Sequence, residues 1–384
     1  PDSHPRVAAR ARSARPYDPV SSLLAIRRNP SVAHHKLDWN ESTIPPSPEV
    51  FRALQRFLAN GNNIHWYPDP CDEELLEKIK IYTSCRTENI LVSNGSDEAL
   101  SLACQTYLDS GDEVVAPFPT YRHFLQFAEL AGARIRLIRK DDPFSVSLRD
   151  VESGISSRTK IVYLANPNNP TGILLEPAQI SRMANRHLQV LFLVDEAYYE
   201  FSGFSCSRFL KNTPNMMITR SFSKCFGLAG LRLGYVIAPT GIIRDLLRVH
   251  NPKSTNIMAQ VAAAAALGDL DYYHDYVDEV RRASSMIKDF CDDHGILCRL
   301  TRANFILITT DHPEWIVEKL RNAGVHVRNR SSQLPGMIRL TVGTSKQMED
   351  VLLRLKAVIK GERSPTEVPV TIGSGPAKPR QGDR

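Results

Sequence analysis

A lysine, two serines and an arginine lie close together in the stretch T219-R-S-F-S-K-C-F-G-L-A-G-L-R-L-G-Y235. The hydroxyls of Ser221 and Ser223 and the guanidinium of Arg232 suit a phosphate, because both kinds of group donate hydrogen bonds to its oxygens. Glycines in the stretch let the backbone approach a ligand closely. Lys224 lies inside this polar cluster, where neighbouring cations favour a nucleophilic amine. A solvated charged loop fits less well, because the flanking residues are apolar.

A carboxylate follows four apolar residues in L191-F-L-V-D-E-A-Y-Y199. The apolar run predicts a buried strand, with Asp195 at its end. Burying an unpaired carboxylate costs several kcal/mol, so Asp195 needs a partner there. The cationic ring nitrogen of a cofactor would supply one. A neighbouring arginine, or a turn that Asp195 caps, is the alternative.

A glycine precedes a predicted helix in L91-V-S-N-G-S-D-E-A-L100. The pattern puts Gly95 in a turn and Ser96 and Asp97 at the helix start, where exposed backbone N–H groups bind anions. An ordinary serine or aspartate helix cap is the alternative for this segment taken alone.

Two prolines make N166-P-N-N-P-T-G172 a rigid turn that presents asparagine side chains, Asn169 among them. A proline-rich loop without a functional role is the alternative for this segment. Together, the four segments describe a single ligand. It has an anion, a ring nitrogen that faces a carboxylate, and a carbonyl that can form an imine with Lys224. Pyridoxal phosphate has these parts.

Apolar segments and helical patterns alternate along most of the chain. We expect strands at 90–93, 113–116, 134–138, 160–165, 190–194, 216–219 and 234–238, and after residue 250 at 304–309, 325–328 and 337–342. We expect helices at 48–59, 72–82, 96–109, 120–131, 177–187, 241–250, 255–267, 271–293, 313–323 and 345–360. This alternation predicts an α/β fold with a mainly parallel sheet, in which ligands bind at the carboxyl ends of strands.

The pattern also predicts how the chain divides. We expect a large cofactor-binding domain over 64–250 and a smaller α+β domain built from 37–63 and 251–360. Residues 1–36 are rich in Arg, Ser and Pro, and residues 361–384 are rich in Pro and Gly, so both are predicted to be disordered tails. The arginine-rich start is also compatible with a transit peptide.

Composition excludes several classes of protein. The net charge is +6, but 1–36 hold seven basic and two acidic residues and 361–384 hold four and three, so the body is neutral. A neutral body argues against binding to nucleic acid. No apolar run reaches the roughly 18–20 residues of a membrane span. Seven scattered cysteines without a C-x-x-C pair indicate reduced thiols and a cytoplasmic location, and no Cys/His cluster predicts a metal site.

On these residues, the sequence resembles the fold-type I pyridoxal phosphate aminotransferases, and among them most closely the histidinol-phosphate aminotransferase family. The resemblance spans roughly 37–360. It rests on N-G-S-D-E, N-P-N-N-P-T-G, V-D-E-A-Y, S-F-S-K-x-F-G-L-A-G-L-R-L-G-Y, A-N-F-I-L and I-R-L-T-V-G-T, in the family's order. It implies transfer of an amino group between a 2-oxo acid and an amino acid or amine that bears an anionic group.

The resemblance also implies a role for each motif residue. Lys224 would form the imine with the cofactor and shuttle the proton at Cα, and Asp195 would keep the pyridine nitrogen protonated. Tyr198 and Asn169 would bind the phenolic oxygen of the ring, and Tyr121 would stack on its face. The cofactor phosphate would be held by Gly95, Ser96, Asp97, Ser221, Ser223 and Arg232.

Further residues are implied to bind substrate or to act between subunits. Tyr67 resembles the tyrosine that reaches the cofactor phosphate of a neighbouring subunit, which implies a homodimer with shared active sites. Arg339 resembles the arginine that grips the acidic group of the substrate, and Arg328 has the position of a second such arginine. Asn40 would lie at the substrate entrance.

Two departures from the family's pattern fall in the predicted substrate pocket. Ile44 stands where the family has a tyrosine, and Lys253 stands where it has an aromatic residue. We infer a changed substrate, although Lys253 could instead point to solvent. A cyclase, an eliminating lyase or a decarboxylase on the same fold is therefore the alternative function. A gene regulator on this fold is not expected, because 36 irregular residues are too few for a DNA-binding domain.

Overall fold

The structure is a computed structural model that describes residues 6–8, 11, 23–30, 32–60 and 64–360. A large sheet has the strand order β2-β8-β7-β6-β5-β3-β4. Its strands are β2 (Ile90–Ser93), β3 (Glu113–Pro117), β4 (Arg134–Ile138), β5 (Thr159–Ala165), β6 (Leu191–Asp195), β7 (Met216–Ser221) and β8 (Gly234–Ile237). β8 runs antiparallel to β2 and β7, and the other neighbours are parallel.

Helices cover both faces of this sheet. On one face α5 (Gly95–Tyr107), α6 (Arg122–Leu130) and α10 (Thr240–Leu246) share an apolar core with alternate strand residues such as Tyr163. On the other face lie α4 (Glu73–Thr83), α7 (Leu148–Ser153), α8 (Pro177–Arg186) and α11 (Ile257–Leu267). Because both faces are covered, every residue of β2, β3, β6, β7 and β8 is buried. The predicted α/β fold is confirmed.

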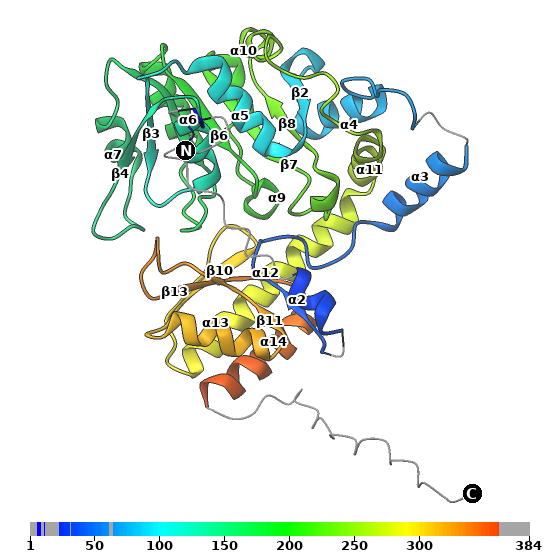
Figure 1. Ribbon diagram of the computed structural model, residues 1–384, viewed down its shortest axis with the longest axis vertical. Coiled ribbons are helices and arrows are strands. Elements are labelled where there is room, and N and C mark those ends of the chain that lie inside the picture. Colours follow the sequence, from blue (N-terminus) through cyan, green and yellow to red (C-terminus); the bar gives the residue numbers. More distant parts are fainter. Residues whose placement is uncertain (1–5, 9–10, 12–22, 31, 61–63, 361–384) are drawn as a thin grey trace, which may run out of the picture.

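A second, smaller part lies beside the large sheet (Figure 1). It contains an antiparallel sheet of β12 (Arg328–Asn329), β13 (Met337–Thr341), β10 (Phe305–Thr309) and β9 (Cys298–Arg299), in that order. β1 (His35–Lys36) pairs in parallel with β11 (Val325–His326). The helices α2 (Leu23–Arg28), α13 (Pro313–Asn322) and α14 (Ser345–Ile359) belong to this part, and α12 (Leu270–Asp293) runs into it from the large one.

Local sequence signals explain where several helices begin. Ser47 caps α3 (Pro48–Ala59) with its side chain, and the proline at the first helical position cannot disturb a backbone bond there. Thr344 and Gln347 form a reciprocal capping box at the start of α14, and Ser147 and Asp150 form one at α7. Shorter segments complete the chain: α9 (Tyr199–Ser202), η1 (Thr87–Asn89), η2 (Ser207–Asn212) and η3 (Ala229–Leu231).

Two expectations need correction. Residues 1–36 are not irregular throughout, because α2 forms within them and His35–Lys36 form β1. Backbone hydrogen bonds to the β11 segment hold β1 in place. His35 N donates to Gly324 O at 2.8 Å, and Leu37 N donates to His326 O at 2.9 Å. The expected strand 325–328 is two short strands, β11 and β12, that belong to different sheets. Of the rest of the predicted N-terminal tail the structure describes only 6–8, 11, 29–30 and 32–34, and the predicted tail 361–384 falls outside the described residues.

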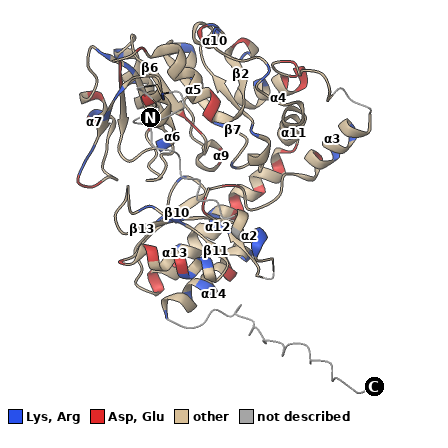
Figure 2. Ribbon diagram, in the orientation of Figure 1, with Lys and Arg blue, Asp and Glu red and all other residues tan. Residues whose placement is uncertain are grey.

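The division into two domains stays a proposal, and the packing bears on its boundaries. α3 and α11, which the sequence assigns to the small domain, contact each other, and α11 also contacts α4 beside the large sheet. Acidic and basic residues both occur on the helices around the two sheets (Figure 2). Within the described ranges, none of the helices has the length and apolar character that crossing a bilayer requires.

Candidate active site

A cavity opens where β5, β6 and β7 reach their carboxyl ends, as the α/β pattern predicts. Ten of the predicted cofactor residues line it: Ser96, Asp97, Tyr121, Asn169, Asp195, Tyr198, Ser221, Ser223, Lys224 and Arg232. It opens into a cleft of about 620 Å³ whose other wall comes from the small sheet and includes Arg328 and Arg339. Sequence segments far apart in the chain therefore meet at one place.

One end of the cavity is built from the start of α5. Gly95 has φ +76°, and a Cβ there would lie 2.7 Å from the Arg232 guanidinium. A Cβ at Gly234 would lie 2.6 Å from the backbone N of Ser96. The close backbone packing therefore requires glycine at Gly234, and the positive φ favours it at Gly95. The residue before the helix, Asn94, makes no side-chain cap bond, which favours an anion site over an ordinary cap.

Asp97 organises the cationic and aromatic groups at this end. Its carboxylate accepts from Arg232 Nη2 at 3.2 Å and from the Tyr121 hydroxyl at 2.9 Å. Arg232 also donates to Ser223 Oγ at 3.3 Å. A carboxylate only accepts hydrogen bonds, so its side chain serves here to orient Arg232 and Tyr121. The donors available to an anion are the helix N–H groups, the serine hydroxyls and Arg232.

The cavity also holds a buried carboxylate. Asp195 lies at the last position of β6 and accepts from Thr219 Oγ1 at 3.0 Å and from the Tyr163 hydroxyl at 3.1 Å. Burial raises the pKa of this carboxyl from 3.8 to about 6, although the two hydroxyl donors act in the opposite direction. Thr219, Tyr163 and the backbone of Ala197 bond this carboxylate, and none of them is charged, so the expected need for a cation stays in place.

Lys224 lines the same cavity. Its Nζ donates to the backbone carbonyl of Trp39 at 2.9 Å and lies 5.9 Å from the centroid of the Tyr198 ring. The segment that follows β1 therefore closes over the site. The sequence motifs gave no indication of this contact, because 185 residues separate its partners.

The hydroxyl of Tyr198 accepts from two asparagines, Asn40 Nδ2 at 2.9 Å and Asn169 Nδ2 at 3.3 Å. Asn40 is fully buried, and its predicted place at the substrate entrance stays a prediction. Its φ is 56°, its backbone N and Oδ1 both bond Thr341 Oγ1 at 3.1 Å, and its carbonyl accepts from Asn304. Asn40 is thus part of the packing that positions Tyr198.

Three arginines line the wall of the cleft that belongs to the small sheet. Arg339 is 4% exposed and donates to Asn169 Oδ1 at 2.8 Å and to the carbonyl of Asp38 at 2.7 Å. Arg328 lies directly opposite Arg339 in the β12–β13 register. Arg330, which the sequence reasoning missed, donates to the same Asn169 oxygen at 2.9 Å. The alternate spacing in R328-N-R330 was the available signal.

Three predicted residues do not meet Lys224 within this chain. Tyr67 is 77% exposed, and Lys253 Nζ lies 4.2 Å from the centroid of its ring. Ile44 lines a separate cleft with Tyr272 and Tyr276. Their roles as substrate or intersubunit residues stay predictions.

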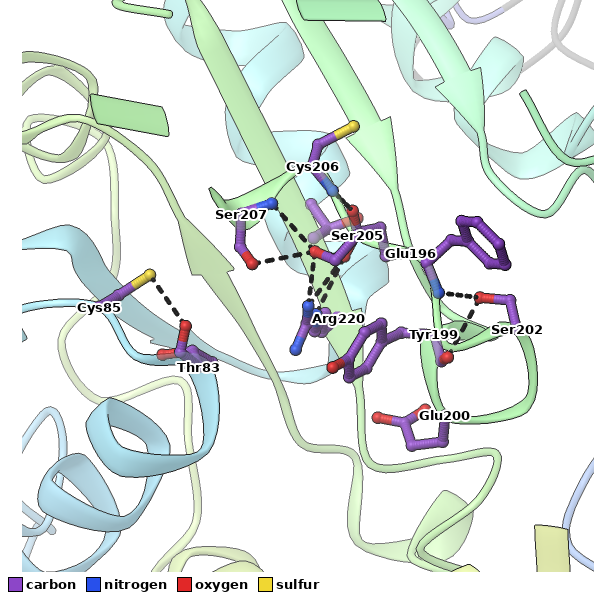
Figure 3. A network of polar contacts seen from close by, with 12 residues as sticks. Thr83, Cys85, Glu196, Tyr199, Glu200, Ser202, Ser205, Cys206, Ser207 and Arg220 are labelled. Carbon is purple, nitrogen blue, oxygen red and sulfur yellow. Dashed lines mark hydrogen bonds and ion pairs between the residues drawn. The ribbon is translucent and has the colours of Figure 1, made fainter. Parts of the chain in front are cut away.

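A buried ion pair supports the strands behind the cavity (Figure 3). Arg220 precedes Ser221 on β7, and its guanidinium lies 3.0 Å from the carboxylate of Glu196, which follows Asp195. Arg220 also donates to Ser205 Oγ at 2.8 Å and lies 3.5 Å from the centroid of the Tyr199 ring. The pair therefore fixes the ends of β6 and β7, from which two cavity residues project.

Comparison with known proteins gives a consistent picture. The family described as aminotransferase class I and II matches residues 35–355. A dihydroxyacetone phosphate transaminase of Campylobacter jejuni is 37% identical over 331 residues, covering 85% of this chain and 90% of the relative. A histidinol-phosphate aminotransferase of Methanosarcina mazei is 35% identical and covers 83% and 86%. The crystal structure of the Sinorhizobium meliloti histidinol-phosphate aminotransferase with pyridoxal 5′-phosphate superposes with a TM-score of 0.84 at 23% identity, covering 94% and 99%.

Proposed function

The chain belongs to the aminotransferase class I and II family and is a transaminase of fold type I, and we propose that it uses pyridoxal phosphate to transfer an amino group between a phosphorylated amine and a 2-oxo acid. A single observation carries the cofactor proposal. One cavity is lined by Ser96 and Arg232, which would bind an anion, by the buried carboxylate of Asp195 and by Lys224.

The residues present fit that cofactor. The glycine-lined start of α5, with Ser221, Ser223 and Arg232, would hold the phosphate. Asp195 would hold the protonated ring nitrogen, and a cation there would offset the cost of burying the carboxylate. Tyr198 and Asn169 would bind the phenolic oxygen.

When bound, the cofactor supplies an aldehyde that condenses with amines and a ring that withdraws electrons from the amine carbon. The chain's own residues position and protonate the reacting groups. Lys224 holds the amine that binds the aldehyde and then moves the proton at Cα. The bond between Tyr198 and the buried Asn40 keeps the phenol in one orientation beside Lys224. The Trp39 carbonyl orients the lysine amine.

Relatives and the arginine wall support a phosphorylated substrate. The Campylobacter and Methanosarcina relatives are each named for a phosphorylated substrate. Amination of the ketone of dihydroxyacetone phosphate gives 2-aminopropane-1,3-diol phosphate, an amine with a phosphate and no carboxylate. Arg328 and Arg339 face the cleft beside Lys224, where a substrate anion would bind.

A homodimer with shared active sites is part of the proposal. The segment 64–67 exposes large apolar side chains, with Ile64 57%, Trp66 63% and Tyr67 77% exposed. Exposed apolar groups in a cluster are typical of protein interfaces. A partner covering this segment would bury Tyr67 and Lys253 and bring them near a second cleft.

The test uses wild type and Lys224→Ala, each purified with pyridoxal phosphate. Wild type should show the visible absorbance of a protein-bound imine, and Lys224→Ala should lack it. Histidinol phosphate and 2-aminopropane-1,3-diol phosphate should then be converted to carbonyl products over many turnovers only when 2-oxoglutarate is supplied in excess. Conversion that continues without an oxo acid would sink the transaminase proposal.

A further inference from the structure

Glu98 is the last residue of the N-G-S-D-E motif, and the proposed function gives it no role. Its Oε2 accepts from the backbone N of Asn94 at 2.5 Å and from Ser254 Oγ at 2.9 Å. We propose that Glu98 is a positioning residue, which fixes the start of α5 for the cofactor phosphate and fastens it to the segment 254–256. The inference rests on the proposed function and adds to it the residues that hold the anion site in shape.

The bond from Asn94 to Glu98 closes the turn from which α5 starts. Asn94 has φ −74° and ψ 71°, and Gly95 after it has φ +76°, so the chain changes direction sharply here. Glycine has no side chain to restrict its backbone, so such a turn keeps one shape only when neighbouring bonds hold it. The bond spans Gly95 and joins the residue before the helix to the first turn. Ser96 and Asp97, which line the cavity, lie within this closed turn.

Ser254 connects the turn to a firmly held part of the chain. Thr255, the next residue, is buried, and its hydroxyl accepts from Gln260 Nε2 at 3.2 Å. Asn256 caps α11, because its Oδ1 accepts from the backbone N of Ala259 at 2.8 Å. The hydroxyl of Ser254 therefore donates from a segment whose own position is set by α11.

The same segment also bonds the chain next to Arg232. Asn256 Nδ2 donates to the Leu231 carbonyl at 3.0 Å, and Leu231 directly precedes Arg232. The start of α5 and Arg232 are packed closely, since a Cβ at Gly95 would lie 2.7 Å from the guanidinium. Residues 254–256 are thus bonded to both segments that supply donors to the anion. Loss of one of these bonds should shift the two sets of donors relative to each other.

The hydrogen bonds of Glu98, rather than its charge, explain its place. Asp97 and Glu98 both lie in the first turn of α5, and the Asp97 carboxylate already pairs with Arg232 at 3.2 Å. A second carboxylate near a phosphate repels it. A carboxylate also accepts stronger hydrogen bonds than a neutral oxygen does. Glutamine at this position would keep an acceptor oxygen and remove the charge, so the two changes act on phosphate binding in opposite directions.

The test titrates the cofactor-free protein with pyridoxal phosphate and, separately, with pyridoxal, which lacks the phosphate. Protein fluorescence gives the two dissociation constants. Glu98→Ala should raise the constant for pyridoxal phosphate by roughly tenfold or more and leave that for pyridoxal within about twofold, because only the phosphate uses the α5 turn. Ser254→Ala removes one of the two bonds and should raise the constant for pyridoxal phosphate by roughly fivefold.

Two further variants show whether the effect is specific to these bonds. Glu98→Gln keeps an acceptor oxygen and should bind both ligands within about threefold of wild type. The matched control is Glu129→Ala on the exposed face of α6, which also removes a carboxylate and should bind both ligands like wild type.

Equal weakening for both ligands in Glu98→Ala would mean that Glu98 supports the cavity as a whole, and would overturn the proposal. Unchanged affinity for pyridoxal phosphate in Glu98→Ala or in Ser254→Ala would overturn it too. If wild type binds pyridoxal phosphate but transaminates no amine, the proposed function fails, while the two dissociation constants still decide the role of Glu98.

Discussion

The hydroxyl of Tyr198 accepts a hydrogen bond at 2.9 Å from Asn40 Nδ2, and Asn40 is fully buried with a positive φ of 56°. The chain adopts an unfavourable backbone conformation there, and bonds to Thr341 and Asn304 hold it. The N-terminal segment is therefore built into the active site, where it also presents the Trp39 carbonyl to Lys224.

The first prediction concerns Asn40→Ala. The substitution removes the Oδ1 acceptor of the buried Thr341 hydroxyl and should cost about 1–3 kcal/mol of the free energy of unfolding. Tyr198 loses its best donor, so the pH titration of the visible absorbance should shift as well. Denaturation and spectral titration measure the two effects. An Asn40→Ala protein with an unaltered spectral titration would show that Asn40 acts on stability alone.

The second prediction separates backbone strain from ligand binding at a glycine. Gly95→Ala and Gly111→Ala both place a side chain at positive φ, +76° and +94°, and each should lose about 1–2 kcal/mol of stability. Only Gly95 has Arg232 against it, whereas nothing lies within 4 Å of a Cβ at Gly111. Pyridoxal phosphate affinity, measured by fluorescence titration, should therefore fall in Gly95→Ala and stay unchanged in Gly111→Ala.

The third prediction is a pH dependence of the cofactor-free protein. The pKa of Asp195 is about 6 in the folded state and ordinarily 3.8, so the folded state binds the extra proton between these values. Stability then decreases as pH rises from 4 to 6, by about 3 kcal/mol in total. Asp195→Asn has no carboxyl group to titrate at this position. Its free energy of unfolding should therefore rise relative to that of wild type as pH increases. Urea denaturation at pH 4 and pH 7.5 gives the difference, and a constant difference would contradict the raised pKa.

The fourth prediction concerns the ion pair behind the cavity. Arg220→Met leaves the carboxylate of Glu196 buried without its cation and should cost about 3–5 kcal/mol. The double variant Arg220→Met, Glu196→Gln removes both charges and should recover part of that loss. A double-mutant cycle by denaturation measures the coupling. Additive losses would mean that the two side chains stabilise the strand ends independently.

The fifth prediction tests the proposed homodimer. Tyr67→Ala and Lys224→Ala each impair one component of a shared site. In a mixed dimer, one site keeps both Tyr67 from one chain and Lys224 from the other, so activity should return when the two variants are co-expressed and the heterodimer is isolated. A different affinity tag on each variant allows the heterodimer to be isolated by two successive purifications. If the heterodimer is no more active than its parents, Tyr67 does not act across the interface.

The sequence by itself determined the elements and most of the cavity. Strands such as β5 and β6 are short apolar runs, and in a parallel sheet their carboxyl ends share one edge, so Asn169 and Asp195 had to meet near Lys224. The motifs are local, because a glycine turn or a helix start depends on neighbouring residues. Local signals of this kind are readable without the fold.

Only the tertiary structure decided the roles of residues that contact distant parts of the chain. Asn40 turned out to be buried support for Tyr198 because strand β13 and residue Asn304 enclose it. Arg330 became visible as a partner of Asn169, 161 residues earlier, only when the small sheet was placed against the cleft. The Arg220–Glu196 pair likewise depends on two strands lying side by side. Such contacts depend on packing, and no spacing along the chain encodes them.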